Sequence, residues 1–506
     1  MTARTIMVQG TASSVGKSIV TAALCRLFRQ EGLSVAPFKS QNMALNAFVT
    51  PEGGEIGRAQ AVQAIAARVV PTVDMNPILL KPEGDARSQV VVLGKSIGSL
   101  AAVEYHARKP ELRDVVAGAL ARLRASHDVV VIEGAGSPAE INLKSRDIVN
   151  MFVAELADAP VLLVGDIDRG GVFAAFVGTM ELLEPHERAR VKAFVVNKFR
   201  GDLRLLQPGL DFLRERTGVP VLGVLPYLPR LRVAEEDSVS LDERRGRRRA
   251  GPTDIDVAIV RLPRISNYDD FQPLEHEPGV AVRFVEHVHE LDGADLVVLP
   301  GTKSTLADLA WIRRTGIGAA IVERAGQGGL VLGVCGGCQM LGTTIADPHR
   351  IESNDGHGEG LGLLGLATEF GREKRATQLR ARAARHSFLA GGGGQPIVGY
   401  EIHMGRITRA PGCEGAFVVT QRNGRADDDV DGAVSGDGAV VGTMIHGLFD
   451  NEGTRRGLLA TLRARKGLPP VEAATPQATA PDEFDRLADA VRANVDLRML
   501  LGWITP

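Results

Sequence analysis

Two glycine-rich turns, each placed between an apolar run and an amphipathic segment, constrain the fold of this 506-residue chain more than any other feature. Residues 10–18 read GTASSVGKS, directly after the apolar run 5–9. Residues 330–342 read LVLGVCGGCQMLG, an apolar run that leads into a second turn. Such turns are typical of parallel sheets with crossover helices, which place their ligands at the carboxyl edge. The chain is too long for one core, and we predict an α/β fold with two doubly wound domains.

Short apolar runs predict the strands of these domains, because each run ends at glycine or a polar residue. A helix over 17–30 follows from apolar residues at helical spacing, and another helix is expected over 482–500. The expected strands are 5–9, 129–133, 161–166 and 193–197 in the first half, and 255–261, 296–300, 330–334 and 439–445 in the second.

A charge-dense stretch divides the chain, since residues 235–253 read EEDSVSLDERRGRRRAGPT and have little to bury. Its basic run 244–249 alternatively forms a nucleic-acid patch, but it lacks interleaved aromatic residues and favours a solvated linker. Surface turns are expected at 391–394 and 427–429. The predicted organisation is a first domain over 1–235, a charged linker over 236–253, a second domain over 254–452 and a helical tail over 453–506.

Composition narrows the kinds of partner. Lys and Arg number 59 against 61 Asp and Glu, a net charge of −2, which does not favour nucleic acid or an anionic membrane. The four cysteines are too few for a disulfide framework in a chain of this length. No apolar run approaches the roughly 20 residues needed to span a bilayer, and the amino terminus lacks a signal-peptide layout. We expect a cytoplasmic protein that binds small molecules.

The first glycine turn predicts a phosphate-binding loop. Backbone N–H groups between Gly10 and Gly16, with a helix N-terminus behind them, form a nest for phosphate oxygens. Lys17 then reaches the terminal phosphates of ATP, and the Ser18 hydroxyl ligates Mg²⁺. The loop has one residue more than usual between its glycines, with Thr11 where the first glycine would stand. It is similar to the loop of dethiobiotin synthetase-like enzymes, which implies phosphorylation of a carboxylate.

A magnesium–ATP site also needs carboxylates that face the metal. Glu133 ends an apolar strand and is expected as a metal ligand, although it is alternatively an ordinary strand-end acid. Glu55 is a second candidate ligand, or else a solvated loop acid. Asp166 and Asp168 end another strand beside Arg169, where they contact substrate or metal, or pair with neighbouring side chains.

The second glycine turn predicts a cysteine nucleophile. Cys335 sits between an apolar strand and a helix, a position that favours the thiolate and exposes the sulfur. The backbone N–H groups of Gly336 and of Gly301 are expected to bind an oxyanion, unless Gly301 marks a plain strand-end turn. Cys335 and Cys338 alternatively form a redox pair or half of a zinc site, which lacks further cysteines at suitable spacing. The pattern G-V-C-G-G-x-Q is similar to that of class I glutamine amidotransferases, which implies attack on the amide of glutamine.

His446 follows the expected strand 439–445 and is the candidate base for the thiol. Many class I glutaminases carry a glutamate two positions after this histidine, and here that position is Leu448. We therefore expect a Cys335–His446 dyad, with the group that orients the imidazole left open. His403 is either a structural histidine or a substrate contact.

Taken in order, the motifs resemble the cobyric acid synthases, glutamine-dependent amidotransferases of corrinoid biosynthesis. The resemblance implies that ammonia freed by Cys335 and His446 reaches the first domain, where ATP activates carboxylates of a corrin ring. It implies amidation of the b, d, e and g side chains of adenosylcobyrinic acid a,c-diamide to give adenosylcobyric acid. The similar segments span nearly the whole chain and read QGTASSVGKS, FKSQNMALNAFVTPEGGEIGRAQ, GDIDRGGVFA, NKFRGD, RLPRISNYDDFQPLEHEPGV, LPGTKST, GVCGGCQMLG and MIHGLFDN.

Gln41, Asn42 and Asn46 are candidate corrin contacts, because their amides can hydrogen-bond the ring's own amides and carboxylates. Alternatively this loop packs on itself. Three other functions are open: the sister cobyrinic acid a,c-diamide synthase, a glutamine-dependent ligase of cell-wall precursors, and a P-loop regulator with an inactive glutaminase domain. The QNMALN and NKFRGD segments favour the cobyric acid synthases over the sister enzyme, and an intact Cys335 and His446 disfavour a regulator.

Overall fold

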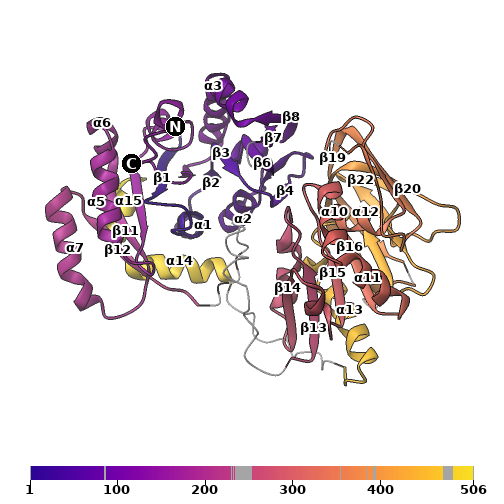
Figure 1. The fold of residues 1–506 in the computed structure, drawn as a ribbon. Helices are drawn as coiled ribbons and strands as arrows, with labels where there is room; N and C mark the ends of the chain where they lie inside the picture. The colour runs from indigo at the N-terminus through magenta and orange to yellow at the C-terminus, as the bar shows by residue number, and fades with distance from the viewer. Residues whose placement is uncertain are drawn as a thin grey trace.

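The computed structural model describes residues 2–84, 87–229, 231, 233, 253–353, 355–384, 386–390, 395–470 and 482–504. Figure 1 shows two α/β halves side by side. The expected linker 236–253, apart from Thr253, and the expected turn at 391–394 lie outside the described residues.

A parallel six-stranded sheet forms the centre of the first half, in the order β12-β11-β10-β1-β9-β2. The expected strands are confirmed, and helix α1 has the expected bounds. Alternate side chains of β1 point into different apolar clusters, Met7 into one and Ile6 and Val8 into the other, so both faces of the sheet are covered. The strands are β1 (Arg4–Gly10), β2 (Val35–Phe38), β9 (Val129–Glu133), β10 (Val161–Asp166), β11 (Val191–Phe199) and β12 (Val221–Pro226).

Helices cover the two faces of this sheet. One face carries α1 (Lys17–Gln30), and the other carries the long helix α3 (Ala102–Ser126). The remaining helices of this half are α2 (Arg58–Ala67), α4 (Met151–Leu156), α5 (Val172–Leu182), α6 (Pro185–Arg188) and α7 (Leu203–Thr217), with short 3-10 helices η1 (Val73–Met75) and η2 (Lys144–Arg146).

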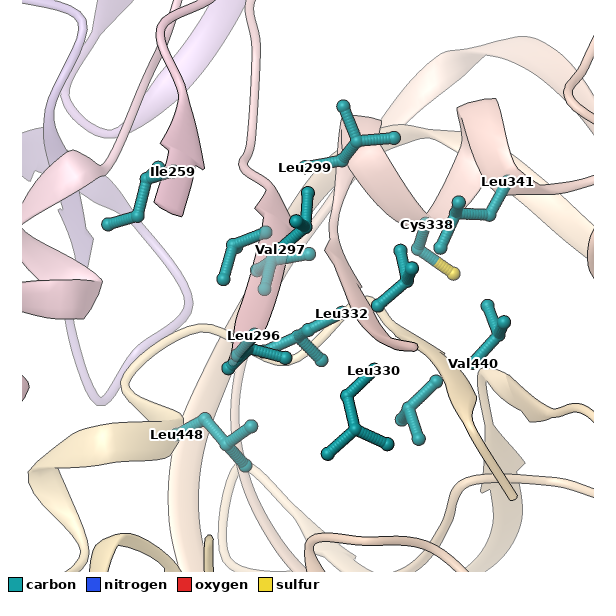
Figure 2. Packing of buried hydrophobic residues seen from close by; sticks show 14 of the residues in the cluster. Ile259, Leu296, Val297, Leu299, Leu330, Leu332, Cys338, Leu341, Val440 and Leu448 are labelled. Atoms are coloured by element: carbon teal, nitrogen blue, oxygen red, sulfur yellow. The ribbon is translucent and has the colours of Figure 1, made fainter. Parts of the chain in front are cut away.

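The second half has its own six-stranded sheet in the order β14-β13-β15-β16-β24-β23, parallel except for β23. Figure 2 shows its apolar core, in which leucine and valine side chains of β15, β16 and β24 interdigitate. The strands are β13 (Ile255–Val260), β14 (Val280–Val285), β15 (Leu296–Leu299), β16 (Leu330–Val334), β23 (Ala433–Val434) and β24 (Val440–Thr443). The helices are η3 (Tyr268–Phe271), α9 (Gln272–Glu275), η4 (Val288–Leu291), α10 (Thr305–Arg314), α11 (Ile317–Gly326), α12 (Gly336–Leu341), η6 (Leu448–Asp450) and α13 (Glu452–Arg465).

A largely antiparallel sheet is added to the second half. It is built from β17 (Thr344–Ala346), β18 (His357–Glu359), β19 (Leu366–Ala383), β20 (Ile397–Arg409), β21 (Phe417–Arg422) and β22 (Arg425–Asp431). The expected surface turn at 427–429 is wrong, because these residues lie within β22, where Asp429 pairs with Val419 of β21 and the two preceding aspartates lie at a shift in register. Arg422 on β21 forms ion pairs with Asp427 and Asp429, which offsets the repulsion among three consecutive aspartates.

The carboxyl-terminal segment packs on both halves. Helix α13 contributes Leu458 and Leu462 to the core of the second half, whereas α14 (Glu483–Asn494) returns to the first half beside α1 (Figure 1). The expected single helix over 482–500 is wrong, because Val495 is extended and bridges Gly223 on the edge strand β12. Asp496 then caps a new helix, α15 (Leu497–Gly502), by accepting a hydrogen bond from the Met499 N–H.

A mixed apolar cluster joins the two halves. Ala47, Val49 and Leu79 of the first half pack with Tyr400 and Ile402 of β20. The first half presents these residues on small sheets made of β3 (Gln41–Met43), β6 (Ile78–Gly84), β7 (Arg87–Val92) and β8 (Lys95–Ala101), and of β4 (Ala47–Val49) and β5 (Glu55–Gly57).

Candidate active sites

Cys335 occupies a strained turn between β16 and α12. Its backbone has φ 51° and ψ −111°, a conformation that costs a residue with a side chain about 1–3 kcal/mol and persists only where the surroundings impose it. The Cys335 N–H donates to the Thr443 carbonyl at 2.7 Å. Gly337 packs so tightly that a Cβ would lie 1.9 Å from the Leu299 carbonyl oxygen. The turn thus presents the sulfur at the carboxyl end of the sheet.

His446, which follows the neighbouring strand β24, shares a pocket with Cys335 and is held by Asp270. The His446 Nδ1–H donates to Asp270 Oδ2 at 2.6 Å, and the Gly447 N–H donates to Asp270 Oδ1 at 2.9 Å. Burial lowers the pKa of His446, but the Asp270 carboxylate and the Cys335 sulfur outweigh burial and raise this pKa to about 10. Among the described residues His446 Nε2 has no hydrogen-bond partner, so it is the nitrogen left to exchange a proton with Cys335.

Asp270 is the functional residue that the sequence analysis leaves unassigned. It lies on η3, 176 residues before His446, so no local spacing connects the two. The position of the usual glutamate is Leu448, which is buried in the apolar core (Figure 2). The signal in the sequence is the pair of adjacent acids, Asp269 and Asp270, within the segment NYDDF.

The two glycines expected to bind an oxyanion flank the cysteine and the histidine. A Cβ on Gly301 would lie 3.3 Å from His446 Cε1, and a Cβ on Gly336 would lie 2.6 Å from Thr302 Cγ2. Cys338 points into the apolar core (Figure 2), where burial raises its pKa well above the usual range. It is a free thiol, which fits a packing residue rather than a redox partner of Cys335.

The pocket beside Cys335 contains a buried acid that the sequence analysis misses. Glu352 Oε1 accepts a hydrogen bond from the Thr305 N–H at 2.8 Å, while Oε2 has no partner in the part of the chain that the structure describes. Burial raises the pKa of Glu352 to about 7. Gln339 also lines the pocket, and its Oε1 accepts from the Thr305 hydroxyl at 3.1 Å. His403 lines the same pocket as a neutral side chain, since burial lowers its pKa to about 4.

Glu55, expected as a magnesium ligand, lies among lysines at the junction of the two halves. Its Oε1 is 2.8 Å from Lys81 Nζ, and its Oε2 pairs with Lys374, which lines the Cys335 pocket together with Lys81. Burial raises the pKa of Glu55, but the two ammonium groups outweigh burial and lower it to about 2. Both oxygens of this carboxylate are thus paired with ammonium groups of the junction, away from Ser18 and the phosphate loop. The structure therefore does not bring Glu55 to the phosphate loop, and it does not fit a metal ligand.

A cavity of about 810 Å³ opens beside the phosphate loop. Gly16, Lys17 and Ser18 line it, and Gly16 caps α1 with φ 100°, a backbone conformation that favours glycine. Gly10 and Thr11 form the turn at the end of β1 and do not line the cavity: a Cβ on Gly10 would lie 2.6 Å from Val15 Cγ2, and the Thr11 N–H donates to the carbonyl of Val164.

Two lysines contact the phosphate loop. Lys17 Nζ donates to the carbonyls of Ala12 at 2.8 Å and Gly136 at 3.0 Å. Lys198, at the end of β11, donates to the Ser14 carbonyl at 2.9 Å and lies 2.8 Å from Asp166 Oδ2. No local pattern in the sequence indicated this role of Lys198, although the residue lies in the NKFRGD segment. Asp166, expected near substrate, is paired with Lys198 and does not line the cavity.

Glu133 ends β9, next to the phosphate loop in the sheet order. Its Oε1 accepts from the Ser18 hydroxyl at 2.8 Å and from Lys39 Nζ at 2.9 Å, and its Oε2 accepts from Gln63 Nε2 at 2.5 Å. Burial raises the pKa of Glu133, but Lys39, Gln63 and Ser18 together hold it below the ordinary value. The structure thus brings together Ser18 and Glu133, two of the three residues expected to bind magnesium, but not Glu55.

The three amides expected to contact a corrin ring are placed differently. Gln41 and Asn42 line the large cavity, and Asn42 donates to Gln60 Oε1 at 2.9 Å. Asn46 does not line it: this side chain is buried next to Ala47 at the junction of the two halves, and its amide atoms have no partner among the residues described. Of these three side chains, two therefore face the cavity that also contains the phosphate loop.

The described residues contain neither a cluster of metal-binding side chains nor a helix able to cross a membrane. No group of three or more His, Cys, Asp and Glu side chains in these residues is arranged to hold a metal ion. No helix within the described ranges combines the length and the apolar character that a bilayer crossing requires.

Comparison with known proteins places both sites in familiar domains. Residues 6–241 match the family of CobQ/CobB/MinD/ParA nucleotide binding domains, and residues 256–454 match the CobB/CobQ-like glutamine amidotransferase domain. The chain is 65% identical to the cobyric acid synthase of Sorangium cellulosum over 99% of its own length and 98% of that protein. It is 53% identical to the cobyric acid synthase of Dehalococcoides mccartyi strain CBDB1 (98% of each chain). It is 50% identical to the cobyric acid synthase of Salmonella heidelberg over 97% of its own length and 96% of that protein.

Proposed function

Because the chain belongs to the cobyric acid synthase family, we propose that it converts adenosylcobyrinic acid a,c-diamide into adenosylcobyric acid by ATP- and glutamine-dependent amidation of four carboxylates, in the cytoplasm. Residues 254–452 release ammonia from glutamine, and residues 1–235 use it. Helix α13 adds to the second unit, and α14 with α15 adds to the first. The observation that carries the proposal is the Asp270–His446 hydrogen bond beside the strained Cys335, which assembles a glutaminase on the same chain as a phosphate loop.

The glutaminase chemistry follows from the charges at the site. A protonated His446, held by Asp270, stabilises the Cys335 thiolate, which attacks the side-chain carbonyl of glutamine. His446 Nε2 then gives its proton to the leaving ammonia, and a thioester forms on Cys335. The N–H groups of Gly336 and Gly301 stabilise the oxyanion. In the second step His446 takes a proton from water, the resulting hydroxide attacks the thioester, and glutamate leaves with the Cys335 thiolate and the protonated His446 restored.

The amino-acid head of glutamine is held by the polar walls of the Cys335 pocket. Glu352 Oε2, buried and unpaired among the described residues, suits the α-ammonium group. The ammonium groups of Lys374 and Lys303, which pair with Glu55 and Glu83, line the same pocket and suit the α-carboxylate. Gln339 adds amide donors and acceptors to this wall.

The phosphate loop and Glu133 carry the synthetase step. Lys17 and the loop N–H groups bind the phosphates of ATP, and a corrin carboxylate attacks the terminal phosphate to give an acyl phosphate and ADP. Mg²⁺ fits the Ser18 and Glu133 oxygens, because this cation takes one or two protein oxygens and completes its shell with phosphate and water; when bound, it neutralises charge on the phosphates. Gln41 and Asn42 orient the macrocycle at the cavity wall. Ammonia then displaces phosphate and leaves an amide.

Mass spectrometry of the corrinoid tests this function. The protein is incubated with glutamine, Mg²⁺–ATP and adenosylcobyrinic acid a,c-diamide, and four successive acid-to-amide mass changes are expected. Cys335→Ser abolishes them with glutamine but not with ammonium salts, whereas Lys17→Ala abolishes them with both nitrogen donors. An unchanged corrinoid, with glutamine still hydrolysed by the wild type, would refute the substrate assignment. No hydrolysis of glutamine would refute the glutaminase.

A further inference from the structure

The residue next to Asp270 connects the catalytic histidine to the first half of the chain. Asp269 Oδ2 lies 2.8 Å from Nε of Arg58, the first residue of α2, while Asp270 holds His446 Nδ1 at 2.6 Å. Both acids are buried on the four-residue helix η3, so neither can move far without moving the other. The contact between the two halves is therefore one peptide unit away from the group that orients the imidazole.

One face of the imidazole is also connected to the first half, through Tyr400. The Tyr400 ring stacks on His446 at 5.3 Å between centroids and an interplanar angle of 19°. Its hydroxyl donates to the Ala47 carbonyl at 3.3 Å and accepts from Asn267 Nδ2 at 3.1 Å. The Ala47 N–H in turn donates to Asn267 Oδ1 at 3.2 Å. Two side chains that contact the catalytic imidazole are thus tied to the first half: Tyr400 to β4 directly, and Asp270 to α2 through its neighbour Asp269.

The Arg58 guanidinium compensates the charge of two buried carboxylates. Asp269 and Asp270 are adjacent buried carboxylates, and burial together with the repulsion from Asp270 raises the pKa of Asp269 to about 6, although Arg58 lowers it. Removing the guanidinium would leave two carboxylates side by side with less compensation. The less costly outcomes are protonation of Asp269 or movement of η3, and movement of η3 displaces the Asp270 carboxylate that holds His446.

The same helix reaches the phosphate site. Gln63, five residues after Arg58 on α2, donates through Nε2 to Glu133 Oε2 at 2.5 Å and to the Ser18 carbonyl at 3.4 Å. An α-helix rises about 1.5 Å per residue, so Arg58 and Gln63 lie roughly 8 Å apart along the axis of one rigid element. One ten-residue helix therefore touches both the oxygen donors of the phosphate site and the acid pair of the glutaminase.

We propose that Arg58 is a positioning residue for the glutaminase, acting through Asp269 and Asp270 on His446, and that α2 makes the reactivity of Cys335 depend on the state of the phosphate site. This proposal rests on the glutaminase part of the proposed function. It gives a physical basis for releasing ammonia when the synthetase site is engaged, because the histidine is oriented from that side.

Alkylation of Cys335 tests the role of Arg58 without ATP or corrinoid. The rate of modification by iodoacetamide is followed by peptide mass spectrometry, with the partly exposed Cys413 as internal reference. Arg58→Met should slow alkylation of Cys335, but not of Cys413, and lower the glutaminase kcat by at least about fivefold with little change in KM. Arg58→Lys should restore part of both rates, and Asp269→Asn, which keeps the size of the side chain, should slow both.

The control variant is Gln378→Ala. Gln378 donates to the Val49 carbonyl across the same junction, and its hydrogen bonds go to Val49 and Asn423 rather than to η3 or α2, so its removal should leave alkylation and kcat at wild-type values. Wild-type alkylation of Cys335 in Arg58→Met or in Asp269→Asn, with native circular dichroism, would overturn the proposal. An equal loss in Gln378→Ala would also overturn it, because loosening of the junction alone would then account for the effect.

Gln63→Leu tests the link to the phosphate site. In the wild type, Mg²⁺–ATP should change the Cys335 alkylation rate and the glutaminase rate by about threefold or more. In Gln63→Leu the ratio of each rate with Mg²⁺–ATP to the same rate without it should be near one. A wild-type ratio in the variant, or no response in the wild type, would overturn the α2 link. Failure of the proposed function appears separately, as absence of corrinoid amidation or of glutamine hydrolysis by the wild type.

Discussion

Asp270 and His446 are joined by a 2.6 Å hydrogen bond although 176 residues separate them in the chain. The sheet order explains how they meet. Asp270 follows β13 and His446 follows β24, and both strands direct their carboxyl ends to the edge where Cys335 ends β16. The glutamate that many class I glutaminases carry near the histidine is not needed, because Asp270 supplies the carboxylate from another loop.

Replacement of this carboxylate should change the pH dependence of glutamine hydrolysis. The folded-state pKa of His446 is raised to about 10, so the imidazolium persists well above neutral pH and is lost only as the pH rises through that value. Asp270→Asn removes the main cause of the raised pKa. We expect the alkaline limb of the kcat/KM profile to move to lower pH and kcat at neutral pH to fall by at least about tenfold. The measurement is glutamate release across the pH range.

A matched variant separates this effect from the loss of any carboxylate in the same half of the chain. Asp292 is exposed and lies after η4 in the same half, and Asp292→Asn should leave the profile unchanged. Ammonia-dependent amidation should persist in Asp270→Asn. An alkaline limb at the wild-type position in Asp270→Asn would contradict the role assigned to this carboxylate.

Lys198 should matter for nucleotide binding although it lies outside the phosphate-loop motif. Its ammonium group ties the Ser14 carbonyl to Asp166, so it fixes the loop and adds positive charge at the cavity. We expect Lys198→Met to raise the KM for ATP by about tenfold or more. Lys192, exposed on the same strand, provides the control, and Lys192→Met should bind ATP as the wild type does. Equal KM values in the two variants would contradict this role.

The sequence predicted the parts of the structure that local patterns determine. The strands β9, β10 and β16 and the helix α1 have the expected bounds, because runs of β-branched residues and a helical apolar period ending before glycine are local signals. The glycines that follow Cys335 also predicted its turn. The structure gives the physical reason, because Gly337 has no room for a side chain against Leu299.

Contacts between distant segments could not be predicted in this way. Asp270 and Tyr400 reach His446 through the packing of distant strands of the second half, and Arg58 reaches Asp269 through the packing of the two halves; no local spacing in the sequence indicates either contact. The break between α14 and α15 has the same origin. The helical pattern of 482–500 is continuous, yet Val495 pairs with Gly223 on an edge strand, and this tertiary contact overrides local propensity.

Glu133 and Glu55 should respond differently when each is neutralised. Glu133 accepts from Ser18 at the phosphate loop, whereas Glu55 is enclosed by Lys81 and Lys374. Glu133→Gln should raise the Mg²⁺ concentration needed for half-maximal ammonia-dependent amidation by about tenfold or more, and Glu55→Gln should leave it unchanged. Titration of Mg²⁺ at fixed ATP measures both. A higher Mg²⁺ concentration for half-maximal amidation in Glu55→Gln would contradict the exclusion of Glu55 from the metal site.

Glu55 should instead govern acid stability. Its pKa falls from an ordinary 4.5 to about 2 in the folded protein, so its ion pairs stabilise the fold above the ordinary pKa and lose this contribution as the pH falls toward 2. Glu55→Gln leaves Lys81 and Lys374 without their partner and should lower the free energy of unfolding by about 3 kcal/mol near pH 5.5. The difference from the wild type should shrink near pH 3.5, as measured by urea denaturation. Glu373→Gln, an exposed neighbour of Lys374, should show no such difference at either pH.

Gly337 and Gly326 provide the sharpest test of the packing that supports the nucleophile. A Cβ on Gly337 would lie 1.9 Å from the Leu299 carbonyl oxygen, a backbone atom that cannot move without distorting β15, whereas a Cβ on Gly326 at the end of α11 meets no atom within 4 Å. Gly337→Ala should therefore lower the free energy of unfolding by more than about 3 kcal/mol and abolish glutaminase activity. Gly326→Ala should change stability by less than about 1 kcal/mol, in the stabilising direction, because alanine reduces the entropy of the unfolded chain. Urea denaturation of the two variants measures the difference, and similar values would mean that the tight turn at Cys335 tolerates a side chain, contrary to the geometry.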